Sequence, residues 1–521
     1  MRKVKWLFFA YLMVIGIIVA ALAASLAVTS PRDPNTVYSA YYDNLKSMDP
    51  AVCNDVDGSA LIANVYECLY GYRYAKKPYE LYPQLAADFP EIAPDGLTYT
   101  IRLRQGIRFY DPTRKAFAGR TGPEMTADDV VYSFKRIANF HLASPNYSTL
   151  FQEKVAGLDE FNAYSERTPA REVDFDRPVE GLQALDRYTV RIKLTKPCPQ
   201  FKYMLAHGGG SIISRKACEM LGDEAIAHHL IGTGPFVLAE HLPEQRIVFT
   251  ASPAYRGRPD VDGDAKLSDA ERLPKIKRMQ FDYFKELIPA WHLFRQGLFD
   301  LAIIPRESFS NAIDPATQEL WPELKTAGMK LSKTPEASMY YYGFNMGDPV
   351  VGKNPALRQA MAMAHDREKF IRIYRNGRGI ALRSMIPPGF RAYDATLNNP
   401  YAQYNPELAR KKLAEAERIH GGKIPDLKLL AQATDTETRQ MTEYFVSEMR
   451  QVLGLTLKAE YVTWARYQEL VDARQTQVFE AGWAADYPDE QTYLAMFYSK
   501  FAPAGGVNSS AYVNPAYDQL Y

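Results

Sequence analysis

Stretches in which apolar and polar residues alternate recur along the chain, and stretches with the apolar spacing of helices lie between them. From Leu97 to Leu103, apolar residues occupy every second position after an Asp95-Gly96 pair. This pattern is typical of a half-buried strand that leaves a tight turn. Because strand and helix signals alternate throughout, the sequence predicts an α/β fold.

Two helices are predicted from their first residues. Thr126, with Asp129 three residues later, has the pattern of a helix cap, and Asn405-Pro406 has the residue types of an N-cap followed by the first helical position. The buried faces expected after these caps consist of Val130, Phe134 and Ile137 in the first helix, and of Ala409, Leu413 and Ala416 in the second.

The middle and the end of the sequence give weaker signals. Residues 290–295 are predicted to form a short helix that Gly297 ends, and the apolar residues 301–304 to form a buried strand. Residues 257–272, rich in Asp, Gly and Pro, are predicted to be a surface insertion. Residues 514–521 have the pattern of a helix start.

The first residues predict export from the cytoplasm. Basic residues 2–5 precede an uncharged, mostly apolar run at residues 6–29, which ends among small side chains. A cleaved signal peptide and an uncleaved helix that inserts in the membrane both fit this pattern. In either case the positive flank stays inside, so the rest of the chain is expected to be periplasmic or otherwise extracytoplasmic, with residues 6–29 as a candidate inner-membrane anchor.

Composition narrows the possible partners. Lys and Arg total 62 and Asp and Glu total 61, which gives a net charge of +1 and no basic field for nucleic acid. Hydrophobic residues make up 47% of the chain, as in an ordinary globular protein with a large core. The four cysteines permit the pairs Cys53–Cys68 and Cys198–Cys218, but free buried thiols are an equally good interpretation.

The sequence contains few signs of catalysis. The local signatures of phosphate loops, zinc proteases and serine hydrolases are absent. His207-Gly208-Gly209-Gly210 has the form of an esterase oxyanion loop, but without a nucleophile motif it is interpreted as a glycine turn between a helix and a strand. His228-His229 has no third ligand at a suitable spacing. We therefore predict no catalytic residue, no metal site and no cofactor.

Seven segments, in order along the chain, resemble the family 5 extracellular solute-binding proteins, the peptide-binding components of ABC importers. The segments are SMDP at 47–50, NVYECLY at 64–70, DGLTY at 95–99, TADDVVYSF at 126–134, GTGPF at 232–236, RQA at 358–360 leading to HDRE at 365–368, and GWAADY at 482–487. No single segment is specific for the family. Their occurrence in the family's order over nearly the whole exported chain is specific for it.

The resemblance implies a periplasmic-binding-protein-like fold with two lobes and an additional inserted domain. Domain I would comprise residues 35–69 and 205–335, domain II residues 70–204, and domain III residues 336–521. In the family the chain continues and returns to domain I, so domain III is expected to be incomplete here, and domain I to expose an unpaired sheet edge.

The resemblance also implies where a peptide would bind. Asp486 matches a carboxylate that pairs with the peptide's α-ammonium group, whereas the residue type alone also fits a turn or helix cap. The other implied contacts are Gly482, Trp483, Ala484 and Ala485 beside the ligand backbone, Asp55, Val56 and Asp57 on an opposite strand, and Tyr341 lining the cleft. A peptide importer has reason to bind these shared backbone and terminal groups, because its ligands differ in their side chains.

Two positions depart from the family pattern. Ser338 and Ala484 stand where some members have a disulfide, so that bridge cannot form. Glu480 stands where some oligopeptide binders have an arginine that receives a ligand carboxylate, and an acid there would repel that group. A cationic or longer ligand, or a carboxylate held by Arg378 or Arg383, becomes an alternative.

The sequence therefore predicts a monomeric, non-enzymatic binding protein that delivers peptides to the permease subunits of an ABC importer. One alternative is a non-peptide solute, such as a metal chelate or an oligosaccharide, on the same fold. The others are an exported peptide hydrolase and, if residues 6–29 are retained, a membrane-tethered sensor.

Overall fold

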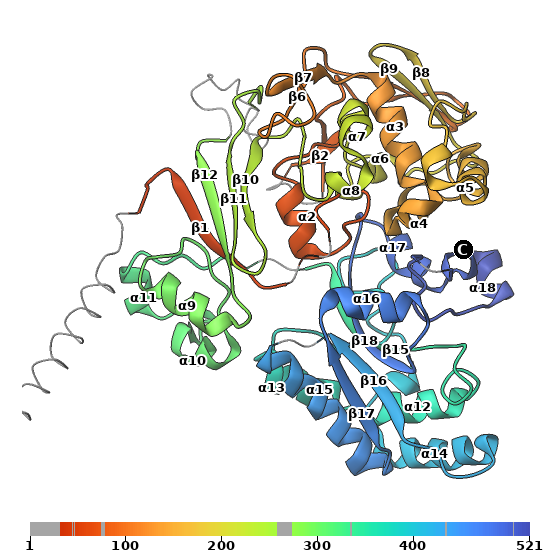
Figure 1. Cartoon of the computed structure of the whole chain (residues 1–521). Coiled ribbons are helices and arrows are strands. Elements are labelled where there is room, and N and C mark those ends of the chain that lie inside the picture. Colours follow the sequence, from red (N-terminus) through yellow and green to blue (C-terminus); the bar gives the residue numbers. More distant parts are fainter. Residues whose placement is uncertain are drawn as a thin grey trace, which may run out of the picture.

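The computed structural model describes residues 32–521, apart from residues 44, 46, 74–78, 258–273, 334–335, 433–434 and 504. Figure 1 shows two lobes. We call residues 32–331 the N-terminal lobe and residues 338–521 the C-terminal lobe. The run at 6–29 and nearly all of the predicted insertion at 257–272 lie outside the described residues. Among the helices that are described, none combines the length and the apolar character needed to cross a membrane.

The first of three four-stranded sheets lies in the N-terminal lobe and has the order β1-β12-β11-β10. Its strands are β1 (Thr36–Tyr41), β10 (Phe236–Leu242), β11 (Arg246–Ala251) and β12 (Arg278–Tyr283). β1 is parallel to β12, and the other pairs are antiparallel. The fully buried Ile247 and Phe249 of β11 pack with Leu61 and Ile62 of helix α2 (Val56–Ile62). Helices α7 (Arg215–Leu221) and α8 (Asp223–Ile226) lie in the same lobe.

Two glycines of the GTGPF segment are required by a close backbone approach. A Cβ atom on Gly232 would lie 2.0 Å from the Val65 carbonyl oxygen, and one on Gly234 would lie 2.6 Å from the same atom. The Gly234 N–H donates to that oxygen at 2.8 Å. Any larger residue would push these two segments apart, which explains physically why glycine stands at both positions.

The second sheet is antiparallel, with the order β4-β5-β9-β8. The strands of this region, including two short pairs, are β2 (Tyr70–Tyr72), β3 (Leu81–Pro83), β4 (Glu91–Ile92), β5 (Thr98–Arg102), β6 (Arg108–Tyr110), β7 (Thr121–Glu124), β8 (Leu182–Asp186) and β9 (Thr189–Lys193). Its helices are α3 (Ala127–Ile137), α4 (Pro145–Leu150), α5 (Leu158–Arg167) and α6 (Phe201–Met204).

The strand predicted from Leu97 to Leu103 and the helix predicted after Thr126 are both confirmed. β5 buries Tyr99 and Ile101, as the alternating pattern requires. α3 begins after Thr126, whose side chain and that of Asp129 form a capping box, and its residues Val130, Phe134 and Ile137 are buried.

A small group of helices and strands ends the N-terminal lobe. It consists of α9 (Leu287–Arg295), α10 (Phe309–Ala312), β13 (Ile313–Asp314), β14 (Glu319–Leu320) and α11 (Pro322–Thr326). α9 confirms the predicted helix, and Gly297 has a φ of +75°. The strand predicted at residues 301–304 is wrong: Leu301 is 60% exposed, and this segment has no regular structure. A short apolar run does not by itself show that a neighbouring strand covers it.

The third sheet forms the C-terminal lobe, with the order β15-β18-β16-β17. Its strands are β15 (Ser338–Phe344), β16 (Leu427–Gln432), β17 (Leu457–Val462) and β18 (Val478–Ala484). Its helices are α12 (Pro355–Ala364), α13 (Arg367–Tyr374), α14 (Pro406–His420), α15 (Thr436–Glu448), α16 (Trp464–Asp472), α17 (Gln491–Leu494) and α18 (Pro515–Leu520). α14 begins at the predicted cap and buries Ala409 and Ala416, with Leu413 packed partly against the same core. α18 confirms the predicted helix start near residue 514.

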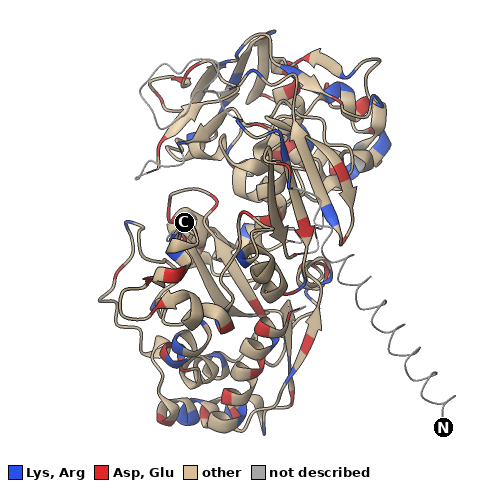
Figure 2. Ribbon diagram, turned by 90° about the vertical axis from the view of Figure 1, so that its left-hand side faces the viewer, with Lys and Arg blue, Asp and Glu red and all other residues tan. Residues whose placement is uncertain are grey.

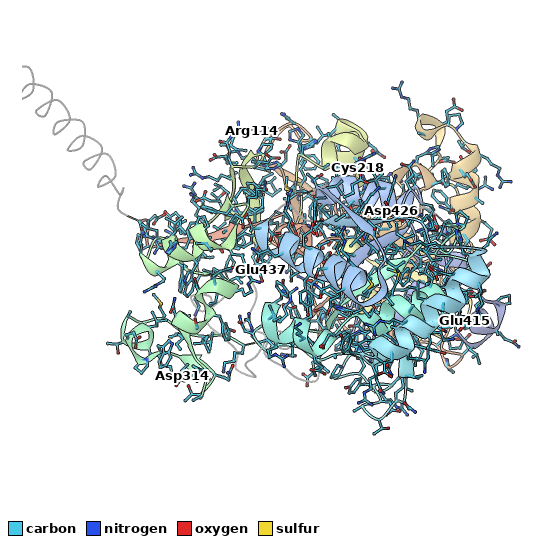
Figure 3. The ribbon with its side chains drawn as sticks, turned by 90° about the horizontal axis from the view of Figure 1, so that it is seen from below. Arg114, Cys218, Asp314, Glu415, Asp426 and Glu437 are labelled. Atoms are coloured by element: carbon cyan, nitrogen blue, oxygen red, sulfur yellow. The ribbon has the colours of Figure 1, made fainter. Side chains whose placement is uncertain are left out.

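The two faces of the third sheet pack on different helices. One face contacts a core built from α12, α14 and α15, and the other packs on α16 through Phe479, Tyr467 and Val471. Figure 3, a view from below, shows Glu415 and Asp426 in the C-terminal lobe and Asp314 in the separate small group around α9–α11. The division of the chain at residues 70, 205 and 336 stays a prediction.

All four cysteines are buried free thiols, so the free-thiol interpretation is confirmed and the disulfide alternative is wrong. Lys and Arg are interspersed with Asp and Glu over both lobes (Figure 2), in keeping with the balanced composition.

Candidate functional site

β18 presents an open backbone edge where the two lobes meet. Along one side it pairs with β15 over its whole length, from Val478 to Ala484. On the other side, β16 pairs with it only at Val478 and Phe479. Beyond Phe479, none of the described strands covers this second edge. Of the four residues predicted to lie beside the ligand backbone, Gly482 and Ala484 are exposed, and Trp483 and Ala485 are half-buried.

The direction of the backbone groups follows from the pairing. The Ala485 N–H donates to the Ala337 carbonyl at 2.8 Å, so residues 481, 483 and 485 direct their hydrogen-bonding groups toward β15. Gly482 and Ala484 therefore direct their N–H and C=O groups toward the open edge. The Glu480 carbonyl, on the same edge, already accepts from the Tyr467 hydroxyl at 2.5 Å.

A cavity of about 100 Å³ lies beside this edge, between the lobes. Its aromatic wall comes from the C-terminal lobe and includes Tyr341, Trp464, Tyr467 and Trp483. Asn54 and Pro145 line it from the N-terminal lobe. Tyr341 and Trp483 stand on the same face of the sheet because Tyr341 pairs with Ala481 and Met339 with Trp483. The structure thus brings together two residues that the resemblance placed in the cleft.

Asp486 follows β18 directly and is held by Thr492. The Thr492 hydroxyl donates to Asp486 Oδ2 at 2.9 Å and accepts from the Asp486 N–H at 3.0 Å. It also accepts from Trp483 Nε1 at 3.4 Å. Thr492 is only 1% exposed, so the carboxylate is fixed by a buried group that has no freedom to turn away.

The second oxygen of Asp486 faces the N-terminal lobe. His207 Nε2 lies 3.7 Å from Asp486 Oδ1, and both side chains are 20% exposed. His207 precedes a 3-10 turn at Gly208–Gly210, where the prediction was a glycine turn leading to a strand; the chain continues instead to α7. Asp486 Oδ1 is therefore a partly desolvated acceptor at the junction of the lobes.

The three residues of the N-terminal lobe that were predicted to contact the ligand lie at the start of a helix and not in a strand. Asp55, Val56 and Asp57 were predicted to form a strand opposite the ligand, and that is wrong, because Asp55 is the N-cap of α2 and Val56 its first residue. Asp55 accepts from the Gly58 N–H at 2.6 Å, which makes it a helix cap. Their neighbour Asn54 lines the cavity instead, and accepts from Gln468 Nε2 at 2.9 Å.

Glu480 points away from the cavity-lining aromatic side chains. It pairs with Tyr342, on the face of β18 opposite to Tyr341 and Trp483, and accepts from the Thr442 hydroxyl at 2.8 Å. Burial raises the pKa of Glu480. Arg378 stacks on the ring of Phe309 at 4.5 Å, and Arg383 donates to the Leu397 carbonyl at 3.4 Å. Neither arginine lines the cavity.

Hydrogen bonds across the junction hold the lobes together in this structure. Besides Asn54–Gln468, they join Asp43 to Gln432 at 3.1 Å, Gln200 to Asp489 at 3.0 Å, Glu286 to Thr436 at 2.9 Å and Arg306 to Gln440 at 2.6 Å. These hydrogen bonds show that the two lobes are in direct contact on both sides of the junction's polar surface.

One of these contacts gives a pH-dependent prediction. Burial, followed by repulsion from Asp57, raises the pKa of Asp43 from 3.8 to about 6. The ionised form is therefore disfavoured in the folded protein, and stability is lost as the pH rises from about 4 through 6. Asp43→Asn keeps an acceptor for Gln432 without the charge. We expect it to raise the free energy of unfolding at pH 7.5 by about 1–2 kcal/mol, which is less than the full shift implies because Asp43 keeps some contact with water.

Urea unfolding of Asp43→Asn and of the parent protein at pH 7.5 and pH 4 measures this effect. The difference between the two proteins should be present at pH 7.5 and nearly vanish at pH 4. An equal difference at both pH values would show that the Asp43 charge is not responsible.

A second prediction concerns the residue that orients Asp486. Thr492→Val removes the hydroxyl that donates to the carboxylate, and we expect it to weaken ligand binding about 3- to 10-fold and stability by about 1–2 kcal/mol. Thr492→Ser keeps the hydroxyl and is the matched control. Isothermal titration calorimetry of both variants measures the effect on binding, and urea unfolding measures the effect on stability. Equal binding by the valine and serine variants would contradict the orienting role.

No pattern in the sequence indicated Thr492, His207, Asn54 or Gln468 as residues of this site. The spacing of Thr492 from Asp486 matches no local motif, and His207 was considered only as part of a hydrolase loop. Asn54 directly precedes the predicted triplet and is the residue of that segment that reaches the cavity.

A two-lobed α/β protein with an open strand edge beside an interlobe cavity, and with an oriented carboxylate at the same junction, has the construction of a solute-binding protein. The chain belongs to the bacterial extracellular solute-binding proteins, family 5, whose family model matches residues 80–504. This confirms the family and the two-lobed α/β fold expected from the sequence.

The relatives differ in what their names say they bind. The chain is 25% identical over 459 residues to the dipeptide-binding protein of Escherichia coli, covering 85% of this chain and 74% of the relative. It is 24% identical over 457 residues to heme-binding protein A of Haemophilus influenzae, covering 86% and 74%. The structure of Listeria monocytogenes OppA bound to peptide is similar with a TM-score of 0.75 at 19% identity, covering 94% of this chain and 88% of that one.

Proposed function

We propose that this protein binds short peptides in the interlobe cavity and delivers them to the permease of an ABC importer. The observation that carries the proposal is the open edge of β18, whose Gly482 and Ala484 backbone groups face the junction directly before the oriented carboxylate of Asp486. An extended peptide can pair with such an edge, and the carboxylate can receive its N-terminal ammonium group.

The proposed binding mode uses groups that every peptide has. Backbone N–H and C=O groups of the ligand would pair with Gly482 and Ala484, in the manner of an added strand. The ammonium group would approach Asp486 Oδ1, because Thr492 already occupies Oδ2. Closure of the lobes removes water from this pair and strengthens its attraction.

The aromatic wall supports the same ligand class. Trp464, Tyr467 and Trp483 provide flat apolar surfaces that accept many side chains without selecting one. Trp464 Nε1 and Gln468 Oε1 are buried without a hydrogen-bond partner in the described structure. Buried polar groups are nearly always paired, so a polar solute or ordered water is expected to satisfy them.

The names of the relatives support a peptide ligand and also supply the competing candidate. The E. coli relative is named for dipeptides, and the solved Listeria relative holds a peptide. The Haemophilus relative is named for heme, so a non-peptide solute in the same cavity is the alternative that an experiment must address.

Native mass spectrometry of the gently purified protein tests the ligand class. We expect a series of short peptides with mixed side chains to be released on denaturation. A single non-peptide mass, such as that of heme, would contradict the peptide proposal and leave the binding-protein fold intact. If the purified sample has lost its ligand, a tripeptide mixture is added to it and native mass spectrometry shows whether peptides bind.

The export signal and the family support a proposal for where the protein works. The family is extracellular by description. We propose that the protein works in the periplasm as a monomer, with residues 6–29 serving as its export signal or as an anchor beside the permease. N-terminal sequencing of the exported protein distinguishes the two roles, since a start near Ala24 or Val28 removes the anchor.

A further inference from the structure

Two polar groups lie in the aromatic wall of the interlobe cavity. Trp464 and Gln468 both line the cavity, and they are four residues apart on α16, so their side chains share one face of that helix. Figure 1 shows α16 on the side of the C-terminal lobe that faces the N-terminal lobe. Trp464 Nε1 and Gln468 Oε1 are buried, and neither atom has a hydrogen-bond partner among the described residues. α16 therefore contributes an unused donor and an unused acceptor to the cavity.

The orientation of the Gln468 amide is set by a contact with the other lobe. Its Nε2 donates to Asn54 Oδ1 at 2.9 Å, and the residue is only 8% exposed. Because Nε2 is engaged in that contact, Oε1 is the amide atom left to accept a hydrogen bond. The indole N–H of Trp464 can only donate. Burying such groups unpaired is costly, so we expect both to be paired when the site is filled.

The pairing of β18 indicates which ligand residue would reach these two groups. A peptide with its ammonium group at Asp486 and its backbone paired to Gly482 and Ala484 would run antiparallel to β18. Its first residue would lie opposite Ala484, its third opposite Gly482 and its second opposite Trp483. Residues directly opposite each other share one face of a sheet, and Trp483 lines the cavity. The second side chain of the peptide would therefore enter the cavity.

We propose that this cavity is a specificity pocket for the second residue of the peptide, and that it selects a side-chain carboxamide, as in glutamine. The proposal rests on the proposed peptide-binding function. A carboxamide has the C=O that the Trp464 N–H requires and the N–H that Gln468 Oε1 requires. The aromatic surfaces accept many side chains, but an apolar one leaves both polar groups unpaired, and this makes the pocket selective.

Other polar side chains satisfy the pocket less well. A carboxylate can accept from Trp464 but has no proton for Gln468 Oε1, and Asp472, which also lines the cavity, would repel it. An ammonium group offers the Trp464 N–H no acceptor. A hydroxyl has its donor and acceptor on one atom, whereas a carboxamide has them on two, to match two separate atoms of the wall. The cavity of about 100 Å³ has room for several water molecules, and so for a side chain of this size.

Tripeptides that differ only in the second side chain test the pocket. Glutamine and methionine have nearly the same length and shape, so Ala-Gln-Ala and Ala-Met-Ala differ mainly in the two proposed hydrogen bonds. By calorimetry at pH 7, we expect the parent protein to bind Ala-Gln-Ala at least about tenfold more tightly than Ala-Met-Ala or Ala-Glu-Ala. Gln-Ala-Ala has the same composition as Ala-Gln-Ala and should bind no more tightly than trialanine.

Gln468→Met and Asn54→Ala form a matched pair of variants. Both substitutions remove the hydrogen bond between the lobes, but only Gln468→Met removes the acceptor Oε1. We expect the preference for Ala-Gln-Ala over Ala-Met-Ala to fall to about threefold or less in Gln468→Met. In Asn54→Ala the preference should remain, because both peptides are weakened by a similar factor. Trp464→Phe keeps an aromatic ring without the N–H, should reduce the preference as Gln468→Met does, and replaces that variant if its melting temperature is lowered.

Equal affinities of the parent protein for Ala-Gln-Ala and Ala-Met-Ala would overturn the pocket proposal. An unchanged preference in both Gln468→Met and Trp464→Phe would also overturn it, as would a gain for Gln-Ala-Ala equal to that for Ala-Gln-Ala. Failure of the parent protein to bind any of these tripeptides would instead contradict the proposed function, and the pocket proposal with it.

Discussion

Substitution of Arg136 by methionine is expected to lower the free energy of unfolding by about 3–5 kcal/mol, because it leaves a buried carboxylate without its counter-charge. Arg136 lies on α3 and forms two hydrogen bonds to Asp49, at 3.0 Å and 2.6 Å. The two side chains are 0% and 4% exposed. Asp49 belongs to the segment between β1 and α2, in the region of the first sheet. Because α3 belongs to the region of the second sheet, the Arg136–Asp49 pair joins the two regions of the N-terminal lobe.

Denaturant unfolding of Arg136→Met measures the loss. The matched control is Arg102→Met, which breaks an ion pair to Glu91 of similar length, 2.7 Å, but with side chains 69% and 67% exposed. That control should cost at most about 1 kcal/mol. If the two substitutions lowered the free energy of unfolding equally, burial would not be the reason why the Arg136–Asp49 pair stabilises the protein.

The largest expected effect on function comes from Asp486→Asn. The substitution keeps the shape of the side chain but removes the negative charge that would pair with the ligand's ammonium group. Loss of one partner of such a partly desolvated pair typically costs about 2–3 kcal/mol, so we expect trialanine to bind roughly 30 to 150 times more weakly.

Calorimetric titration of the parent protein and Asp486→Asn with trialanine tests this expectation. N-acetyl-trialanine is the internal control: it should bind both proteins weakly and equally, because it has no charge for Asp486 to recognise. If the substitution weakened both ligands to the same extent, Asp486 would have a structural role and the ammonium group would bind elsewhere.

Local sequence patterns predicted local structure well in this protein. The cap formed by Thr126 and Asp129 and the alternation around Tyr99 depend on neighbouring residues only, and both appear in the structure as predicted. The segment at residues 301–304 failed because its burial depends on what another part of the chain contributes. Apolar character alone does not contain that information.

The candidate site could be predicted only in part, for the same reason. Asp486 and Trp483 were placed by a family resemblance, and the structure brings both to the junction of the lobes. The direction of the Glu480 side chain depends on the register of β18 against β15. His207 reaches Asp486 from another lobe, and no pattern in a single sequence indicates a contact between residues so far apart.

The triplet Asp55–Asp57 shows a different kind of error. Position in the sequence matched a ligand-lining strand, but Asp55 has the residue type of a helix cap and acts as one. Local cap chemistry determined the structure there, and the cavity is lined by the preceding residue, Asn54, instead.

The most direct test of the central claim is a crystal structure of the protein with bound trialanine. We predict that backbone groups of the ligand lie about 2.9 Å from the N–H and C=O groups of Gly482 and Ala484, and that the ammonium nitrogen lies at a similar distance from Asp486 Oδ1. A peptide bound away from β18, or with its carboxylate end at Asp486, would contradict the account.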